Sequence, residues 1–148
     1  MVSRKSGKIA GRIAAFQGGP LDAHYLAYFD CFNQQQFYEA HDVLEELWLT
    51  ERHGPLGKFY QGLIQLAGAF VHLQKDRLRP AAALLKLARA NLSRHLPVRE
   101  QLDLTEVLAL TGQWLDWLET EQFTRNPLQK HPAPRLQLQA EDRPDCAV

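Results

Sequence analysis

The chain has few cysteines, no long apolar run and no net charge, and each absence removes a class of function. Two cysteines, Cys31 and Cys146, are too few for a disulfide framework or a cysteine-based zinc site, and a reducing cytoplasm is the default compartment. The longest uncharged run near the middle, residues 59–73, has 15 residues, whereas a membrane span needs about 20 mostly apolar ones. Basic and acidic residues both number 17, so no overall field favours nucleic acid or an anionic membrane.

What the middle of the chain does have is helical periodicity, without the two-residue alternation of strands. Proline marks the first turn of two of the predicted helices, at Pro55 and Pro80. The five predicted helices cover approximately residues 22–35, 36–51, 55–76, 79–95 and 103–121. Because the connections are short, sequential helices should be antiparallel neighbours. The sequence therefore predicts an all-α fold, a compact bundle of about five helices.

A chain of 148 residues fits one domain, which we place at residues 21–122. Residues 1–20 carry four basic residues and no acidic one, and they are predicted to form a flexible, disordered N-terminal tail. Four of the eight prolines follow Asn126, so residues 123–148 are predicted to form an extended or disordered C-terminal tail.

Charge is unevenly spread along the chain despite its balanced total. Residues 34–50 contain four acidic residues and no lysine or arginine, whereas residues 75–99 contain seven basic residues and one acidic one. No aromatic residues alternate with these bases, so nucleic-acid binding is disfavoured. The acidic and basic helices could instead pair within one chain or between chains, which keeps a homo-oligomer open as an interpretation.

The third predicted helix is apolar nearly all round, so we expect it inside the bundle. One stripe of this helix is nevertheless polar or small. It consists of Gln61, Gln65, Gly68 and His72. A buried amide or imidazole without a hydrogen-bond partner costs about 1–3 kcal/mol. The stripe must therefore meet polar partners, water or a ligand.

The preceding helix supplies candidate partners. His41 and Glu45 are four residues apart and lie on one side of that helix. A simple helical hairpin sets His41 level with Gln65 and Glu45 level with Gln61. His72 falls roughly 10 Å further along the axis and is expected at the rim of this cluster.

Three functions fit such a cluster. In the first, the protein binds a small molecule and has acid–base or hydrolytic activity, with His41 and Glu45 as the catalytic residues. The residues predicted to bind the ligand are Gln61, Gln65, His72, Trp48 and Tyr38. In the second, the same residues form a structural hydrogen-bond network in a helical interaction or dimerisation module. In the third, His41 and Glu45 bind a divalent metal, although glutamine is a poor third ligand.

Two stretches resemble a known family. "FNQQQFYEAHDVLEELW" and "FYQGLIQLAGAFVHL" are similar to the signature of domain-of-unknown-function family 309. The resemblance implies a small all-helical soluble protein of prokaryotic type with no established activity. Asp42 stands where the family usually has glutamate, and Gly62 fits a close approach between helices. The signature residues that the resemblance implies are Glu39, His41, Glu45, Trp48, Gln61, Gly62, Gln65 and His72.

Overall fold

Six α-helices, two short strands and two 3₁₀ turns make up residues 7–139, the part of the chain that this computed structural model describes. The helices are α1 (Gly7–Ala14), α2 (Ala23–Asn33), α3 (Phe37–Glu51), α4 (Gly57–Gln74), α5 (Leu78–Leu92) and α6 (Leu104–Thr120). The remaining elements are η1 (Ser93–His95), β1 (Val98–Arg99), β2 (Leu102–Asp103) and η2 (Pro127–Gln129). The predicted all-α bundle is confirmed, and each of the five predicted helices is present.

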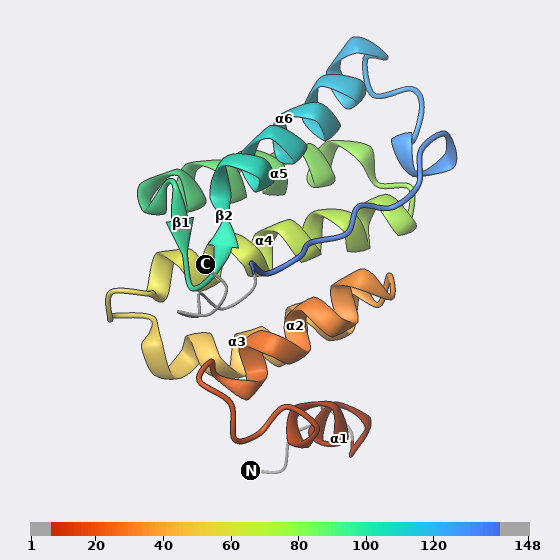
Figure 1. Cartoon of the computed structure of the whole chain (residues 1–148). Helices are drawn as coiled ribbons and strands as arrows, with labels where there is room; N and C mark the ends of the chain where they lie inside the picture. Colours follow the sequence, from red (N-terminus) through yellow and green to blue (C-terminus); the bar gives the residue numbers. More distant parts are fainter. Residues whose placement is uncertain (1–6, 140–148) are drawn as a thin grey trace, which may run out of the picture.

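Helix α4 lies at the centre of the bundle, with α3 on one side and α5 on the other (Figure 1). Its apolar residues fill the core, and Phe59, Leu63 and Phe70 are fully buried. The predicted close approach at Gly62 is confirmed, because a Cβ atom there would lie 2.7 Å from Cγ of Leu92 on α5. The glycine thus lets the two helices pack closely along this edge.

Helices α2 and α3 are joined by a tight turn rather than a kinked continuous helix. Gln35 has a φ of 63°, and the amide of Gln36 donates to the carbonyl of Cys31 at 2.9 Å. The amide of Gln35 donates to the carbonyl of Phe32 at 2.9 Å, which completes a Schellman motif. The chain reverses at this motif, so α3 lies beside α2 and presents its other side to α4.

Helix α1 differs from the flexible tail that the sequence predicts for residues 1–20. Ile9 is buried, and Ile13 and Phe16 pack against the core at helical spacing. Arg12 forms an ion pair with Asp30 of α2, with 2.7 Å between the nitrogen and the oxygen. An apolar stripe and an inward ion pair therefore hold this segment against the bundle. Residues 1–6 of the predicted tail lie outside the described residues.

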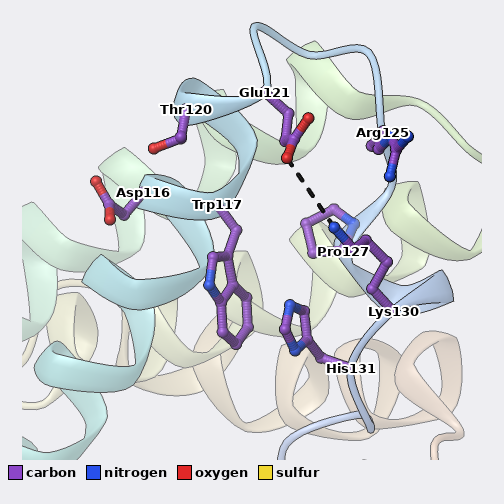
Figure 2. A pocket seen from close by; sticks show the side chains of 8 residues that line it. All are labelled: Asp116, Trp117, Thr120, Glu121, Arg125, Pro127, Lys130 and His131. Atoms are coloured by element: carbon purple, nitrogen blue, oxygen red, sulfur yellow. Dashed lines mark ion pairs between the residues drawn. The ribbon is translucent and has the colours of Figure 1, made fainter.

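The segment after α6 runs back along the bundle, partly as the extended chain that the sequence predicts for residues 123–148. Asn126 is buried and donates to the carbonyl of Leu73 at 2.6 Å. His131 stacks on Trp117, with ring centroids 3.6 Å apart and an angle of 3° between the planes (Figure 2). These contacts fix residues 126–131 against α4 and α6. Residues 140–148 of the predicted tail lie outside the described residues.

A two-stranded hairpin that the sequence does not predict lies between α5 and α6. Strands β1 and β2 pair antiparallel around Glu100 and Gln101, which have φ values of 48° and 63°. Two contacts from distant segments stabilise these left-handed residues. The hydroxyl of Tyr25 donates to the carbonyl of Glu100 at 2.9 Å, and the amide of Gln139 donates to that of Gln101 at 2.7 Å.

Among residues 7–139, no helix has both the length and the apolar character needed to cross a bilayer.

Candidate ligand-binding site

A cavity of about 210 Å³ opens between α3, α4 and α5, and we call it the α3–α4–α5 pocket. Helix α3 contributes two aromatic rings, α4 contributes most of the floor, and α5 contributes one leucine. The lining residues are Tyr38, His41, Ile64, Gln65, Gly68, Val71, His72 and Leu84. The wall is therefore mostly apolar, with two imidazoles, an amide and a phenol placed in it.

Gly68 explains why the cavity lies here. It belongs to the polar stripe of α4 and lies between Gln65 and His72, one turn from each. A Cβ atom at this position would lie 3.1 Å from Cδ1 of Leu84 and 3.9 Å from Cδ2 of His41. The missing side chain leaves the space that those two residues border.

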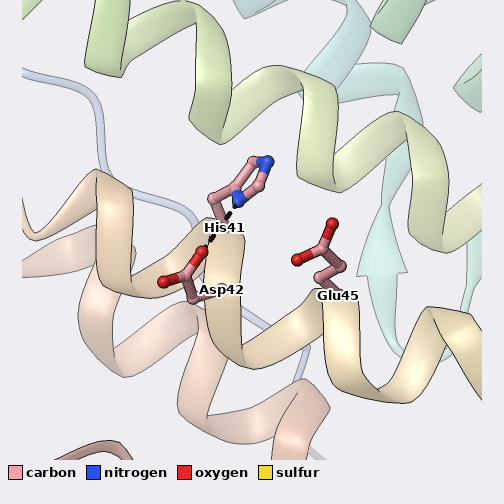
Figure 3. Close-up of side chains that lie close together, drawn as sticks. All are labelled: His41, Asp42 and Glu45. Atoms are coloured by element: carbon pink, nitrogen blue, oxygen red, sulfur yellow. Dashed lines mark hydrogen bonds and ion pairs between the residues drawn. The ribbon is translucent and has the colours of Figure 1, made fainter. Parts of the chain in front are cut away.

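His41 extends from α3 toward α4 and carries an acidic neighbour (Figure 3). Its Nδ1 lies 3.2 Å from Oδ1 of Asp42. The His41 side chain is 32% exposed and that of Asp42 is 14% exposed, so both are partly shielded from water. The ring of Tyr38 lies parallel to the imidazole, with an interplanar angle of 6° and 6.4 Å between the centroids. This side of the pocket is therefore formed by two parallel rings.

Gln65 is oriented by a residue that sequence analysis missed. Asn91 of α5 is buried, and its Nδ2 donates to Oε1 of Gln65 at 2.8 Å. The only signal for this contact in the sequence is a polar residue on the apolar face of α5. The hydrogen bond directs the oxygen of the Gln65 amide toward Asn91, and the NH₂ group of that amide is a donor.

His72 joins the same cavity, although the register argument placed it at the rim of the cluster. Its Nδ1 is buried and has no hydrogen-bond partner among the described residues. Burial lowers the pKa of His72 below 6.5, and the positive charges of Arg77 and Lys75 lower it further. The ring is therefore neutral at pH 7, and it adds no charge to the apolar end of the pocket.

The structure brings together four of the seven predicted site residues, namely Tyr38, His41, Gln65 and His72. The other three lie outside the pocket lining. Gln61 accepts from Lys58 at 3.3 Å, and Trp48 lies beneath the guanidinium of Arg52 at 6.0 Å. Glu45 lies one turn after His41 on α3, and its side chain is on the same side of that helix (Figure 3). Ligand binding by any of these residues stays a prediction.

Glu45 belongs to a second arrangement around the same histidine. One ligand atom each from His41, Asp42 and Glu45 lies within 4.8 Å of the others. All three side chains are partly buried. Only His41 and Glu45 were predicted as metal ligands from the sequence, and the carboxylate of Asp42 offers the third ligand atom that glutamine supplies poorly.

A second cavity, of about 170 Å³, lies at the far end of α6 beside the Trp117–His131 stack (Figure 2). It is bordered by acidic and basic side chains, among them Glu121 and Lys130, which pair at 4.0 Å. None of the predicted site residues lines it. We therefore take the α3–α4–α5 pocket as the candidate site.

Comparison with known proteins identifies a family for the segment that forms this pocket. No curated protein and no solved structure matches the chain. Residues 25–84 match the family model described as "Domain of unknown function (DUF309)". Every residue that lines the α3–α4–α5 pocket falls within this range. This match confirms the resemblance of the two helical stretches to that family.

Proposed function

We propose that the protein binds a small, mostly apolar organic molecule in the α3–α4–α5 pocket, with His41 as its proton acceptor. One observation carries the proposal. An imidazole from α3 and an amide and an imidazole from α4 border one cavity whose remaining wall is largely aliphatic. Ligand sites in proteins typically combine an apolar wall with a few converging polar groups.

Energetics favour an occupant with its own polar groups. Nδ1 of His72 is buried and has no hydrogen-bond partner among the described residues. An unpaired buried polar group costs about 1–3 kcal/mol. Such a cost is retained at binding sites because the ligand, when present, supplies the missing partner or reorders the groups around it.

The size of the pocket limits the ligand. Pockets for drug-sized molecules span roughly 300–1,000 Å³. At about 210 Å³, the α3–α4–α5 pocket suits a molecule of about one ring. Acid–base chemistry is within reach of this arrangement, since Asp42 beside His41 is the pairing that orients a histidine as a general base.

A thermal-shift screen with small neutral molecules tests the proposal. A ligand at 100 times its Kd stabilises the folded state by about 2.7 kcal/mol, which raises Tm by about 5–10 °C in a domain of this size. We expect such increases in the wild type and in His53→Ala, whose histidine is exposed in the loop after α3. His41→Ala should fold but lose the increase. Stabilisation that persists in His41→Ala, or a variant that does not fold, would contradict the proposal.

A divalent metal is the second candidate, supported by the cluster of His41, Asp42 and Glu45. Two ligand atoms that each lie about 2.1 Å from one ion are at most about 4.2 Å apart, so small side-chain rotations would close this cluster around a metal. A histidine nitrogen with two carboxylates suits zinc or manganese.

Elemental analysis of untagged protein purified without a chelator separates the two candidates. Near-stoichiometric metal in the wild type and in His53→Ala, with none in His41→Ala, would establish the metal site. The same low metal content in all three proteins would rule it out and leave the organic ligand.

A further inference from the structure

We propose that the α3–α4–α5 pocket selects a neutral amide group, in which an N–H and a C=O lie side by side, over a carboxylate or an ester. This inference rests on the proposed function and names the chemical class of its ligand. A six-membered lactam or a primary carboxamide with an aliphatic or aromatic body belongs to this class.

The donor half of the recognition comes from Gln65. Nδ2 of Asn91 donates to Oε1 of Gln65 at 2.8 Å, and Asn91 is 9% exposed. An amide that accepts through its oxygen presents its nitrogen as a donor only. Because Asn91 is buried on α5, the Gln65 amide has a fixed orientation. Its NH₂ group can then donate to an acceptor such as a carbonyl oxygen on the ligand.

The acceptor half comes from His41. Its Nδ1 is 3.2 Å from a carboxylate oxygen of Asp42, and an ionised carboxylate only accepts hydrogen bonds. In the tautomer that donates to Asp42, the proton lies on Nδ1 and Nε2 has a lone pair. Figure 3 shows this second nitrogen at the tip of the ring, directed toward the ribbon of α4. Nε2 of His41 can therefore accept a hydrogen bond from a donor such as an N–H on the ligand.

An N–H and a C=O side by side satisfy both groups, because the acceptor on α3 and the donor on α4 line one cavity. A carboxylate has no hydrogen to donate to His41, and it would lie near the negative charges of Asp42 and Glu45. An ester has no donor either. The aliphatic lining from Ile64, Val71 and Leu84 accommodates the rest of a small ring.

Binding of δ-valerolactam and δ-valerolactone, which have the same shape and differ by N–H against O, tests the inference. Isothermal titration calorimetry of the wild type should give a Kd for the lactam at least about tenfold lower than that for the lactone. The lactone loses one hydrogen bond, and its ring oxygen would face the acceptor Nε2 of His41. Equal affinities would overturn the inference and leave the proposed function intact if His41→Ala abolishes both. Binding of neither probe would also overturn it, while the thermal-shift screen would still decide the proposed function.

Asp42→Asn gives an independent readout of the same idea. Its amide can donate to Nδ1 of His41, which moves the ring proton to Nε2 and turns that nitrogen into a donor. The preference for the lactam over the lactone should then fall at least about tenfold, and the ¹⁵N shifts of the imidazole should report the change of tautomer. Glu46→Gln, which removes one charge from the same helix outside the pocket lining, is the control and should keep the wild-type preference. An unchanged tautomer and preference in Asp42→Asn would contradict the inference.

Discussion

Replacing Gly62 with alanine tests the close packing of α4 against α5 that positions the pocket. The new methyl carbon would lie 2.7 Å from Cγ and 2.8 Å from Cδ2 of Leu92, and 3.2 Å from Cβ of Asn91. Leu92 is fully buried, so it cannot swing into solvent. Overpacking of this kind costs about 1–3 kcal/mol, while alanine in a helix gains about 1 kcal/mol over glycine. We expect a net loss of about 1 kcal/mol in the free energy of unfolding.

Gly68→Ala is the matched control, because it makes the same chemical change in the same helix. Its methyl carbon would lie 3.1 Å from the end of the partly exposed Leu84 side chain and 3.9 Å, an ordinary contact distance, from Cδ2 of His41. The helix gain of about 1 kcal/mol should then equal or exceed the packing cost, so the control should be at least as stable as the wild type.

Urea unfolding followed by far-UV circular dichroism measures the free energy of unfolding of both variants. In a thermal melt, each kcal/mol corresponds to about 2–4 °C in Tm for a domain of this size. Gly62→Ala should melt below the wild type, and Gly68→Ala at or above it. Equal stability of the two variants would refute the argument that α4 and α5 are in closest contact at Gly62.

Three further predictions concern His72, Asn126 and Tyr28. Because burial lowers the pKa of His72, the unfolded chain binds more protons, and stability should fall as the pH drops below about 6.5 toward that lowered pKa. His72→Gln should reduce this slope in urea melts, and an unchanged slope would contradict the assignment. Asn126→Ala removes the donor to the carbonyl of Leu73 and should lower the free energy of unfolding by about 1–2 kcal/mol. Tyr28→Phe removes a buried hydrogen bond of 2.7 Å to the carbonyl of Leu63 and should cost about 1 kcal/mol. A urea midpoint equal to that of the wild type, in Asn126→Ala or in Tyr28→Phe, would disprove the corresponding prediction.

The helices could be predicted because their apolar periodicity reflects burial directly, whereas the left-handed residues that follow several of them could not. Gln35, Asp76 and Gln122 follow the ends of α2, α4 and α6 and have φ values of 63°, 59° and 55°. Glycine usually occupies this left-handed position, so its absence removed the signal. The hairpin turn at Glu100 and Gln101 was hidden for the same reason, since contacts from Tyr25 and Gln139 hold it in place.

The candidate site was predictable to the extent that two neighbouring helices define it. The hairpin register between α3 and α4 brought His41 near Gln65, and both residues line the same cavity, because helical rise and a short loop limit how far apart they can lie along the axis. Asn91 and Leu84 could not be placed, because their positions depend on the packing of α5 across α4. Gly68 was part of the predicted stripe, but a cavity depends on the side chains that surround an empty position, which periodicity does not describe.

The most direct test of the account is a ¹H–¹⁵N correlation spectrum of the labelled protein titrated with δ-valerolactam. We predict that the shifted amides cluster at residues 38–41, 64–72 and 84, which surround the α3–α4–α5 pocket. The shifts should disappear in His41→Ala and remain in His53→Ala. Shifts that cluster around the Trp117–His131 stack, or an unchanged spectrum at every lactam concentration, would contradict the claim that this pocket is a ligand site for this class of molecule.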